Sequence, residues 1–460
     1  MTLKNKTTIV VTALLTTIVL FSSISTGLVS GQLSAAQISQ YSIPTDDNTI
    51  YNVAEDEIPQ AMLNSIPAKA ISNAEPLYTE PLTIPQRFLG LETQIHGFSG
   101  VYVDESGKLV VYTSDSTVKS VDQKTIANMI GPDYLSHGVI IKSSKHSYHK
   151  WAQLELILLK LFDDRNLGVT SMGLDDKNQV YTIGFEKLDD SRKIFVDNFL
   201  AKHKIPSEMI KLVETGKLVP TKGDDSTQDY APVVVNPIAA GSEIGLIESV
   251  PAFGSYTPHC TLGLIATTGG QYVGVTAGHC QDFNGGKWFN GKQQYVQPYS
   301  TSPYNVQHVY PLGRSVATAI AHAVPSVSDA VLTSITETQN FGKIYTYNGV
   351  STTYKTISGK LVSVSGSQIC YMGATSGIEK CGTVSATNQS IYDSGLSKTI
   401  SGQVTTNISP AKGGDSGSPV YSAFGSNIPF AGTVWCCDGG NVYYSPIQGI
   451  DQDYGTLTIR

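Results

Sequence analysis

The feature that most constrains the fold is a rhythm of short strand-like runs from about residue 236 to residue 460. Runs such as CTLGLIAT, QYVGVTA, KLVSVSG and PFAGTVW recur roughly every ten residues, with turn residues between them. β-Branched and aromatic residues favour strands, so this half predicts an all-β sandwich or a pair of barrels. A chain of 460 residues exceeds one ordinary domain, and we expect two or three folded units.

Charge divides the chain near Tyr230. Up to that residue there are 21 basic and 27 acidic residues, and after it there are 10 and 11. The charged half contains two alternating hairpin patterns, an apolar helix pattern at 151–162 and a second helix that Asp190 would cap. Residues 85–220 therefore predict a small α+β domain. The formal net charge of −7 and the lack of a basic stripe argue against a nucleic-acid partner.

The N-terminus has the pattern of a secretory signal peptide over residues 1–31. Lys4 and Lys6 precede an apolar run at 9–21, and small residues follow. The run is short for a membrane span, which needs about 20 residues, although an uncleaved anchor is the alternative. We expect a secreted, extracellular protein without stable membrane association. Residues 32–84 predict a linker or loosely ordered arm, and 221–235 a flexible, cleavable linker.

All six cysteines lie after residue 259. In an oxidising compartment disulfides are expected. The spacings suggest Cys260–Cys280 and Cys370–Cys381, although six cysteines allow fifteen pairings. Cys436 and Cys437 are adjacent, and ordinary disulfide geometry does not easily join them. Three states are open for them: a strained vicinal Cys436–Cys437 disulfide, two free thiols, or an intermolecular disulfide.

Three segments carry candidate catalytic residues: TAGHC with His279, VSDAVL with Asp329 and KGGDSGSPV with Ser416. A serine hydroxyl needs a nearby base to become a nucleophile, and histidine titrates near neutral pH. A carboxylate then fixes the histidine tautomer. The glycine-rich turn predicts an oxyanion hole made by the N–H groups of Gly414 and Ser416. This chemistry requires no metal and no organic cofactor.

These three segments resemble the signature segments of the chymotrypsin-like serine peptidases, and most closely the secreted streptogrisin and α-lytic protease group. The resemblance covers about 236–460, the predicted protease domain. It implies a mostly β fold of two antiparallel six-stranded barrels with the active site between them. It also implies disulfides Cys260–Cys280 and Cys370–Cys381. The segments at 99–115 and 199–216 resemble that group's pro-regions, which implies a pro-domain that aids folding and inhibits the protease.

Several residues depart from the family pattern. Ser418 replaces the second glycine of GDSGGP, and Pro410 stands where a trypsin-like enzyme has an acid. On the strand that would pair with substrate, Trp435 or Cys436 takes the usual edge position, and Asp438 could face the pocket. The family's partner for Asp415 is a cation, and four residues are candidates here: Arg314, Lys343, Lys355 and Lys360.

The sequence thus predicts a secreted serine endopeptidase made as a zymogen. Its partners would be protein or peptide substrates and its own pro-domain as an intramolecular inhibitor. Two alternatives stay open: a catalytically inactive binding protein with a protease fold, and an esterase-type acyl hydrolase.

Overall fold

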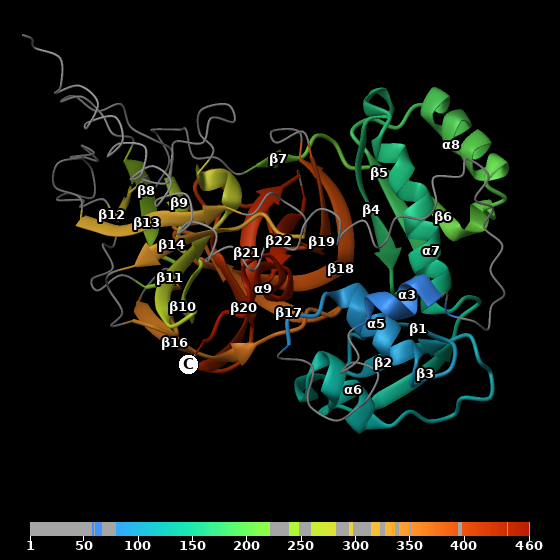
Figure 1. Cartoon of the computed structure of the whole chain (residues 1–460), viewed down its shortest axis with the longest axis horizontal. Coiled ribbons are helices and arrows are strands. Elements are labelled where there is room, and N and C mark those ends of the chain that lie inside the picture. The colour runs from blue at the N-terminus through green and yellow to red at the C-terminus, as the bar shows by residue number, and fades with distance from the viewer. Residues whose placement is uncertain are drawn as a thin grey trace, which may run out of the picture. The chain divides into compact units, whose positions relative to one another are not determined.

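The structure of the chain is a computed structural model, shown in Figure 1. It describes residues 58, 60–66, 80–220, 239–247, 259–281, 294–297, 314–322, 327–335, 340–348, 351–393, 398–438 and 440–459. All of them belong to one compact unit, residues 45–460. The predicted signal peptide and the whole predicted linker at 221–235 lie outside the described residues, as does most of the predicted arm at 32–84. No helix in the described ranges is long and apolar enough to cross a membrane.

The N-terminal part contains a three-stranded sheet with helices packed on it. Strand β1 pairs antiparallel with β2, and β2 pairs parallel with β3. The elements are α3 (Gln60–Ser65), α5 (Ile84–Glu92), β1 (Phe98–Val103), β2 (Leu109–Thr113), α6 (Gln123–Ile130) and β3 (Val139–Ser143). Helix α5 begins at a capping box, in which Thr83 and Gln86 satisfy each other's backbone N–H groups. Helix α3 lies inside the stretch predicted as an arm, and its Met62 is buried.

The other three strands of the N-terminal part are β4, β5 and β6. Strands β4 and β5 form the predicted hairpin, and β6 adds parallel to β5. The elements are α7 (Tyr148–Leu158), β4 (Val169–Asp175), β5 (Val180–Phe185), α8 (Asp190–Lys202) and β6 (Ile210–Glu214). Helices α7 and α8 lie beside these strands (Figure 1). The cap of α8 is Asp189, whose side chain accepts from the N–H of Arg192, so Asp190 is the first helical residue rather than the cap.

The C-terminal part is β-rich, as predicted, and its first half forms a seven-stranded sheet. The strand order is β10-β11-β14-β13-β12-β8-β9, an open path among the described residues. The strands are β8 (Glu243–Ile247), β9 (His259–Thr261), β10 (Leu264–Thr268), β11 (Gln271–Thr276), β12 (Gln294–Gln297), β13 (Arg314–His322) and β14 (Val331–Ile335). Most neighbours are adjacent or nearly adjacent in sequence, which is typical of antiparallel hairpins.

The second half forms a closed circuit of six strands. β17 pairs with β18, β18 with β19, β19 with β22, β22 with β21, β21 with β20, and β20 with β17. The elements are β15 (Lys343–Tyr347), β16 (Thr352–Lys360), β17 (Gln368–Met372), β18 (Glu379–Asp393), β19 (Lys398–Thr406), β20 (Pro419–Ser422), β21 (Asn427–Cys437), β22 (Val442–Pro446) and α9 (Ile447–Tyr454). Closure removes free sheet edges within this circuit.

The N-terminal and C-terminal parts share a sheet. Strand β4 pairs antiparallel with the long strand β18, so β4, β5 and β6 extend the C-terminal sheet. The apolar core is shared as well, because one cluster of buried side chains contains Trp151 of α7 together with Tyr371 and Tyr444 of the closed circuit. Tyr134 adds a polar contact by donating its hydroxyl to the carbonyl of Val362.

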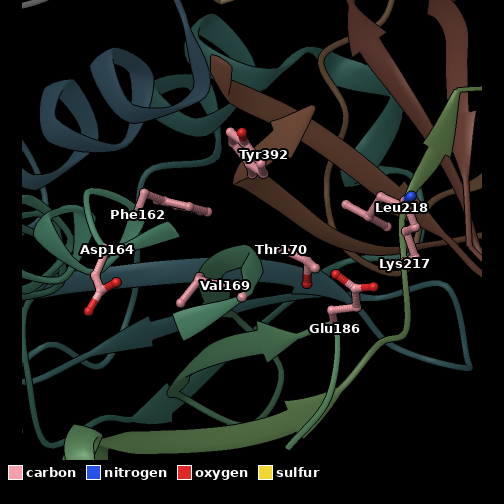
Figure 2. Close-up of a pocket in the computed structure, with 9 residues that line it drawn as sticks. Phe162, Asp164, Val169, Thr170, Glu186, Lys217, Leu218 and Tyr392 are labelled. Carbon is pink, nitrogen blue, oxygen red and sulfur yellow. The ribbon is translucent and has the colours of Figure 1, made fainter. Parts of the chain in front are cut away.

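A second strand contact follows in the chain. Strand β7 (Val219–Pro220) pairs antiparallel with the end of β21. Lys217 and Leu218, just before β7, line a small cavity of about 80 Å³ (Figure 2). Its other walls come from the segment before β4, from β4 itself, from Glu186 just after β5 and from Tyr392 of β18. Leu218 is 4% exposed. Packing of this apolar side chain fixes the path that delivers β7 to β21.

Two carboxyl groups of the N-terminal part face β18, and Asp176 is buried whereas Glu155 is partly buried. Glu155 of α7 accepts from Asn388 Nδ2 at 3.1 Å and from Ser390 Oγ at 3.5 Å. Asp176 accepts from Thr387 Oγ1 at 3.4 Å. Burial raises the pKa of Glu155 to about 7, and its hydrogen bonds only partly oppose the shift. Burial likewise raises the pKa of Asp176. The contact therefore favours protonated carboxyl groups.

We expect the stability of the full chain to fall as pH rises from about 4.5 to about 7. The pKa of the Glu155 carboxyl is higher in the folded chain than in the unfolded chain, so the folded chain binds its proton more tightly. The protonated carboxyl therefore contributes its full stabilisation below the unfolded-state pKa, and this stabilisation is lost as pH rises through the folded-state pKa. Glu155→Gln should remove about 3 kcal/mol of the pH-dependent change. The measurement is the free energy of unfolding at pH 4.5 and pH 8, in a Ser416→Ala background.

The matched control is Glu105→Gln, because the Glu105 side chain is 95% exposed. That variant should keep the full pH dependence. An unchanged pH dependence in Glu155→Gln would contradict the interpretation.

Candidate active site

His279 and Asp329 meet because β11 and β14 are antiparallel neighbours. Their register pairs Thr276, the last residue of β11, with Val331, the first of β14. His279 follows β11 in a short 3₁₀ helix (Gly278–Gln281), and Asp329 lies two positions before the first residue of β14. The end of one strand and the start of the next lie at the same sheet edge, so both side chains project there.

The three predicted catalytic side chains form one hydrogen-bonded chain. Asp329 Oδ2 lies 2.5 Å from His279 Nδ1, and its Oδ1 accepts from the His279 backbone N–H at 3.0 Å. His279 Nε2 lies 2.7 Å from Ser416 Oγ. With Nδ1 donating to the carboxylate, Nε2 is left to accept the serine proton. The fold thereby brings together three residues that are separated in the sequence by 50 and 87 positions.

The turn that carries Ser416 is held from the seven-stranded sheet. The backbone N–H of Thr261 donates to the carbonyl of Ser416 at 2.7 Å, and Thr261 Oγ1 donates to the carbonyl of Gly414 at 2.9 Å. Gly414 has φ +94° and Gly417 has φ +87°. A side chain at Gly417 would place its Cβ 2.1 Å from Thr276 Oγ1. Both positions therefore require glycine.

Ser418 replaces the family's glycine and has a bonding role here. Its backbone N–H donates to the carbonyl of Asp415 at 3.0 Å, and its Oγ donates to the same carbonyl at 2.5 Å. A peptide unit is planar and trans, so fixing the Asp415 carbonyl also fixes the opposite direction for the Ser416 N–H. The N–H of Gly414 bonds to no other described residue. The Gly414 N–H of this turn is thus left for another acceptor.

Asp415 lacks the expected cation. Its Oδ1 accepts from the Ser376 N–H at 2.8 Å, and its Oδ2 accepts from Ser376 Oγ and from the Lys412 N–H. Of the four cationic candidates that the sequence left open, Lys355 pairs with Glu379, Lys360 pairs with Asp451, and Lys343 makes no bond to Asp415. The side chain of Arg314 lies outside the described residues. Burial raises the pKa of Asp415.

A polar network behind Asp329 was missed in the sequence. Ser445 Oγ accepts from the Asp329 N–H at 2.8 Å and donates to Gln403 Oε1 at 2.9 Å. Trp435 Nε1 donates to the same oxygen at 2.8 Å, and Gln403 Nε2 donates to the carbonyl of Val327 at 2.9 Å. These residues belong to the closed circuit, and no local motif marks them. They fix the segment that carries Asp329.

The end of β21 lies beside the candidate active site and is paired with β7. Cys436 pairs with Pro220 and Cys437 with Val219, whereas Trp435 sits at a bulge and is fully buried. Cys436, rather than Trp435, therefore occupies the edge position. The Asp438 carboxylate accepts a hydrogen bond from the Tyr443 hydroxyl at 2.6 Å.

The vicinal pair Cys436–Cys437 suggested by the sequence is not formed, since both are free thiols. Burial, reinforced by Asp438, raises the pKa of Cys437 to about 11. Burial also raises the pKa of Cys436. Because the thiolate is the reactive form, neither cysteine competes with Ser416 as a nucleophile at neutral pH.

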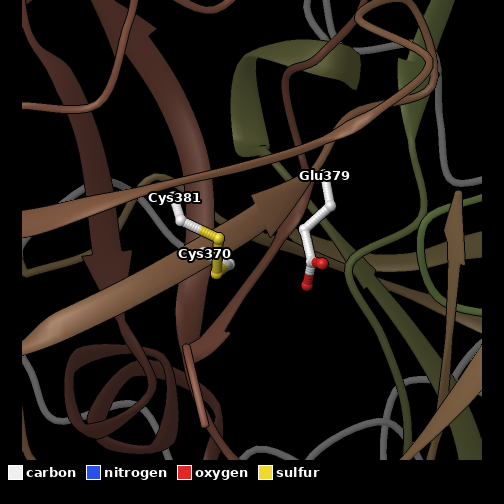
Figure 3. Close-up of side chains that lie close together, drawn as sticks. All are labelled: Cys370, Glu379 and Cys381. Atoms are coloured by element: carbon white, nitrogen blue, oxygen red, sulfur yellow. A yellow bond between two sulfur atoms is a disulfide. The ribbon is translucent and has the colours of Figure 1, made fainter. Parts of the chain in front are cut away.

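The two disulfides expected from the spacing are present. Cys260–Cys280 closes a 20-residue separation next to His279, and Cys370–Cys381 closes an 11-residue separation (Figure 3). Glu379 lies close to the second disulfide, and this is the one possible metal-ligand cluster among the described residues. Its sulfurs are bonded to each other and are not thiolates, and Glu379 binds Lys355 and Tyr421. The cluster does not fit a metal ion.

The chain is similar in sequence to two known proteins. No family model matches the chain. It is 30% identical over 204 residues to streptogrisin-C of Streptomyces griseus, covering 44% of this chain and 38% of that protein. It is 25% identical over 259 residues to streptogrisin-A of the same organism, covering 53% and 75%. The match thus spans well under half of streptogrisin-C and three quarters of streptogrisin-A.

Solved structures similar to this chain include Thermobifida fusca protease A and the α-lytic protease homolog N4. Each is 24% identical and covers 48% of this chain with a TM-score of 0.35, and the match includes 99% and 98% of those chains. The hydrogen-bonded serine, histidine and aspartate define the class as one of Ser-His-Asp proteins. Over about half of its length, the chain is similar in sequence to these streptogrisins.

Replacing both Cys260 and Cys280 by alanine should lower the free energy of unfolding by about 3 kcal/mol, because the cross-link restricts the unfolded chain. Denaturant unfolding in a Ser416→Ala background measures this loss. The control is Cys437→Ala, which removes a thiol outside both disulfides and should have a much smaller effect. Equal stability of the double variant and its parent would show that this disulfide does not brace the fold.

Proposed function

We propose that the protein is a secreted serine endopeptidase made as a zymogen. The observation that carries the proposal is the 2.7 Å contact between His279 Nε2 and Ser416 Oγ, with Asp329 bound to the other imidazole nitrogen. A serine hydroxyl aligned on an imidazole that a carboxylate orients is the arrangement that nucleophilic acyl transfer requires. The sequence similarity to the streptogrisins supports a peptide bond as the substrate.

The reaction begins when His279 Nε2 removes the Ser416 proton as Oγ attacks the substrate carbonyl carbon. The carbonyl oxygen becomes an oxyanion and accepts from the N–H groups of Gly414 and Ser416. His279 then gives its proton to the leaving amine, and an acyl-enzyme remains on Ser416. Water, deprotonated by His279, attacks the ester and releases the acid. Asp329 holds the imidazole tautomer and stabilises the imidazolium throughout.

The proposal includes a two-barrel protease domain over 236–460. The closed circuit from β17 to β22 supports one six-stranded barrel, and the seven-stranded sheet would supply the other. His279 and Asp329 come from the seven-stranded sheet, whereas Ser416 lies between β19 and β20 of the circuit. The site would therefore lie where the two barrels meet. Substrate would pair with the backbone at the end of β21, in the place that β7 takes in the full chain.

The zymogen proposal rests on the position of β7. This short strand occupies the end of β21, where we place the substrate, and it belongs to the segment just before the predicted cleavable linker. His279 and Ser416 are 1% and 0% exposed in the full chain. Residues 85–220 would thus act as an intramolecular inhibitor, held by β4 on β18 and by the shared apolar core. The predicted signal peptide and the two disulfides support secretion.

A fluorophosphonate probe should label Ser416 once residues 1–235 have been removed, and His279→Ala should label far more slowly. Peptide and ester substrates with matched acyl groups then separate the alternatives. We expect hydrolysis of both, because acyl transfer through the same acyl-enzyme serves either bond. Absence of labelling would favour the inactive binding protein. Labelling with ester cleavage but no amide cleavage would favour the esterase-type hydrolase.

N-terminal sequencing of the secreted product should place the mature N-terminus within or next to residues 221–235. Ser416→Ala should be secreted at full length after signal removal, because the proposed cleavage is autocatalytic. Normal processing of Ser416→Ala would show that another protease makes the cut. Loss of processing in wild-type protein together with absence of labelling would contradict the zymogen proposal.

A further inference from the structure

Asp415 and Ser376 join two segments that lie 39 residues apart in the chain. The Asp415 side chain is fully buried and lies between the catalytic Ser416 and the oxyanion donor Gly414 in sequence. A buried carboxylate is costly unless its oxygens are hydrogen-bonded. Three donors serve it, and two of them belong to Ser376. The third, the Lys412 N–H, comes from the same turn and cannot tie the turn to another element.

The chain segment around Ser376 is itself rigidly placed. It lies in the loop between β17 and β18, which the disulfide Cys370–Cys381 closes. Within the loop the Gly377 N–H donates to the carbonyl of Gly373 at 2.9 Å. A side chain at Gly373 would place its Cβ 2.2 Å from Asp415 Oδ1, so the backbone approaches the carboxylate as closely as glycine allows.

Thr261 links this loop to the same turn. The Ala374 N–H donates to Thr261 Oγ1 at 3.1 Å, and that hydroxyl donates to the carbonyl of Gly414. The turn is thus held at two carbonyls by Thr261 and at one carboxylate by Ser376. Rotation of the peptide units on either side of Asp415 would break one of these contacts.

The Lys380 ammonium is the cation that acts on the Asp415 carboxylate, and it is not bonded to it. Lys380 acts on it only at long range, and its Nζ donates to the carbonyl of Pro410 at 3.0 Å. No ion pair to Asp415 occurs among the described residues. A hydroxyl and an N–H from one residue therefore occupy the place that a cation holds in the family pattern.

We propose that Ser376 is a positioning residue for acyl transfer, which clamps the Asp415 carboxylate so that the Gly414 and Ser416 N–H groups converge on the oxyanion. The proposal rests on the proposed function. Ser376 touches no reacting atom in this scheme and acts through Asp415 alone. Because the donors matter most when the oxyanion forms, weakening the clamp should act on the transition state more than on substrate binding.

The test compares Ser376→Ala, Ser376→Thr and Thr375→Val in the processed enzyme made from the full chain. Active-site titration with a fluorophosphonate normalises every rate to folded sites. Ser376→Ala should lower kcat about tenfold or more, by loss of one hydrogen bond to a charged group, while KM changes less than about threefold. Ser376→Thr retains the hydroxyl and should recover most of kcat.

Thr375→Val is the matched control, because it removes the neighbouring buried hydroxyl, which makes no bond to Asp415. It should leave kcat near the wild-type value. A peptide boronic acid gives a second readout, since its tetrahedral adduct on Ser416 places an oxygen in the oxyanion hole. Its affinity should fall in Ser376→Ala by about the same factor as kcat.

The outcomes are distinguishable. If wild type neither labels nor cleaves peptides, the proposed function fails and the role of Ser376 fails with it. If wild type is active and Ser376→Ala keeps wild-type kcat and boronate affinity, only the clamp is overturned. If Ser376→Ala yields too few titratable sites, Ser376→Cys replaces it. A wild-type kcat in Ser376→Cys, whose S–H is a weak donor, would also overturn the clamp.

Discussion

The antiparallel pairing of β11 with β14 is the constraint on which the candidate site depends. Its register sets Thr276 opposite Val331, and this places the residues beyond each strand end at one edge of the sheet. His279 and Asp329 can then meet over 3.0 Å and 2.5 Å contacts although 50 residues separate them. A slip of one residue would turn the side chains of the slipped strand to the other face of the sheet and separate the pair.

Ser416 reaches this edge from a different set of strands, and hydrogen bonds rather than apolar packing define its place. Thr261 of β9 binds the carbonyls of Gly414 and Ser416, and Ser418 binds that of Asp415. The Gly414 N–H of this turn bonds to no other described residue, and in the proposed mechanism it serves the incoming oxygen together with the Ser416 N–H. Buried polar groups that are fully paired rigidify a site, because any alternative leaves one of them unpaired.

Local patterns predicted a large share of the fold. The hairpins β1–β2 and β4–β5 and helix α7 lie where alternation and apolar spacing indicated, because those signals act between near neighbours in sequence. The serine, histidine and aspartate segments were also recognisable. The partner of Asp415 was not, since Lys355 and Lys360 have closer acids in Glu379 and Asp451. Ser376 carries no motif, and only folding brings it to Asp415.

The sequence by itself determined the chemical groups: one histidine beside a strand end, one aspartate entering a strand, and one serine in a turn that requires glycine. It also determined the division into a charged α+β part and a neutral β part. Only the tertiary structure decided that β4 pairs with β18, that β7 lies on β21, and that Ser376 binds Asp415. Backbone propensity is set by residues a few positions apart, whereas these partners are selected by which buried groups must be paired once distant strands pack together.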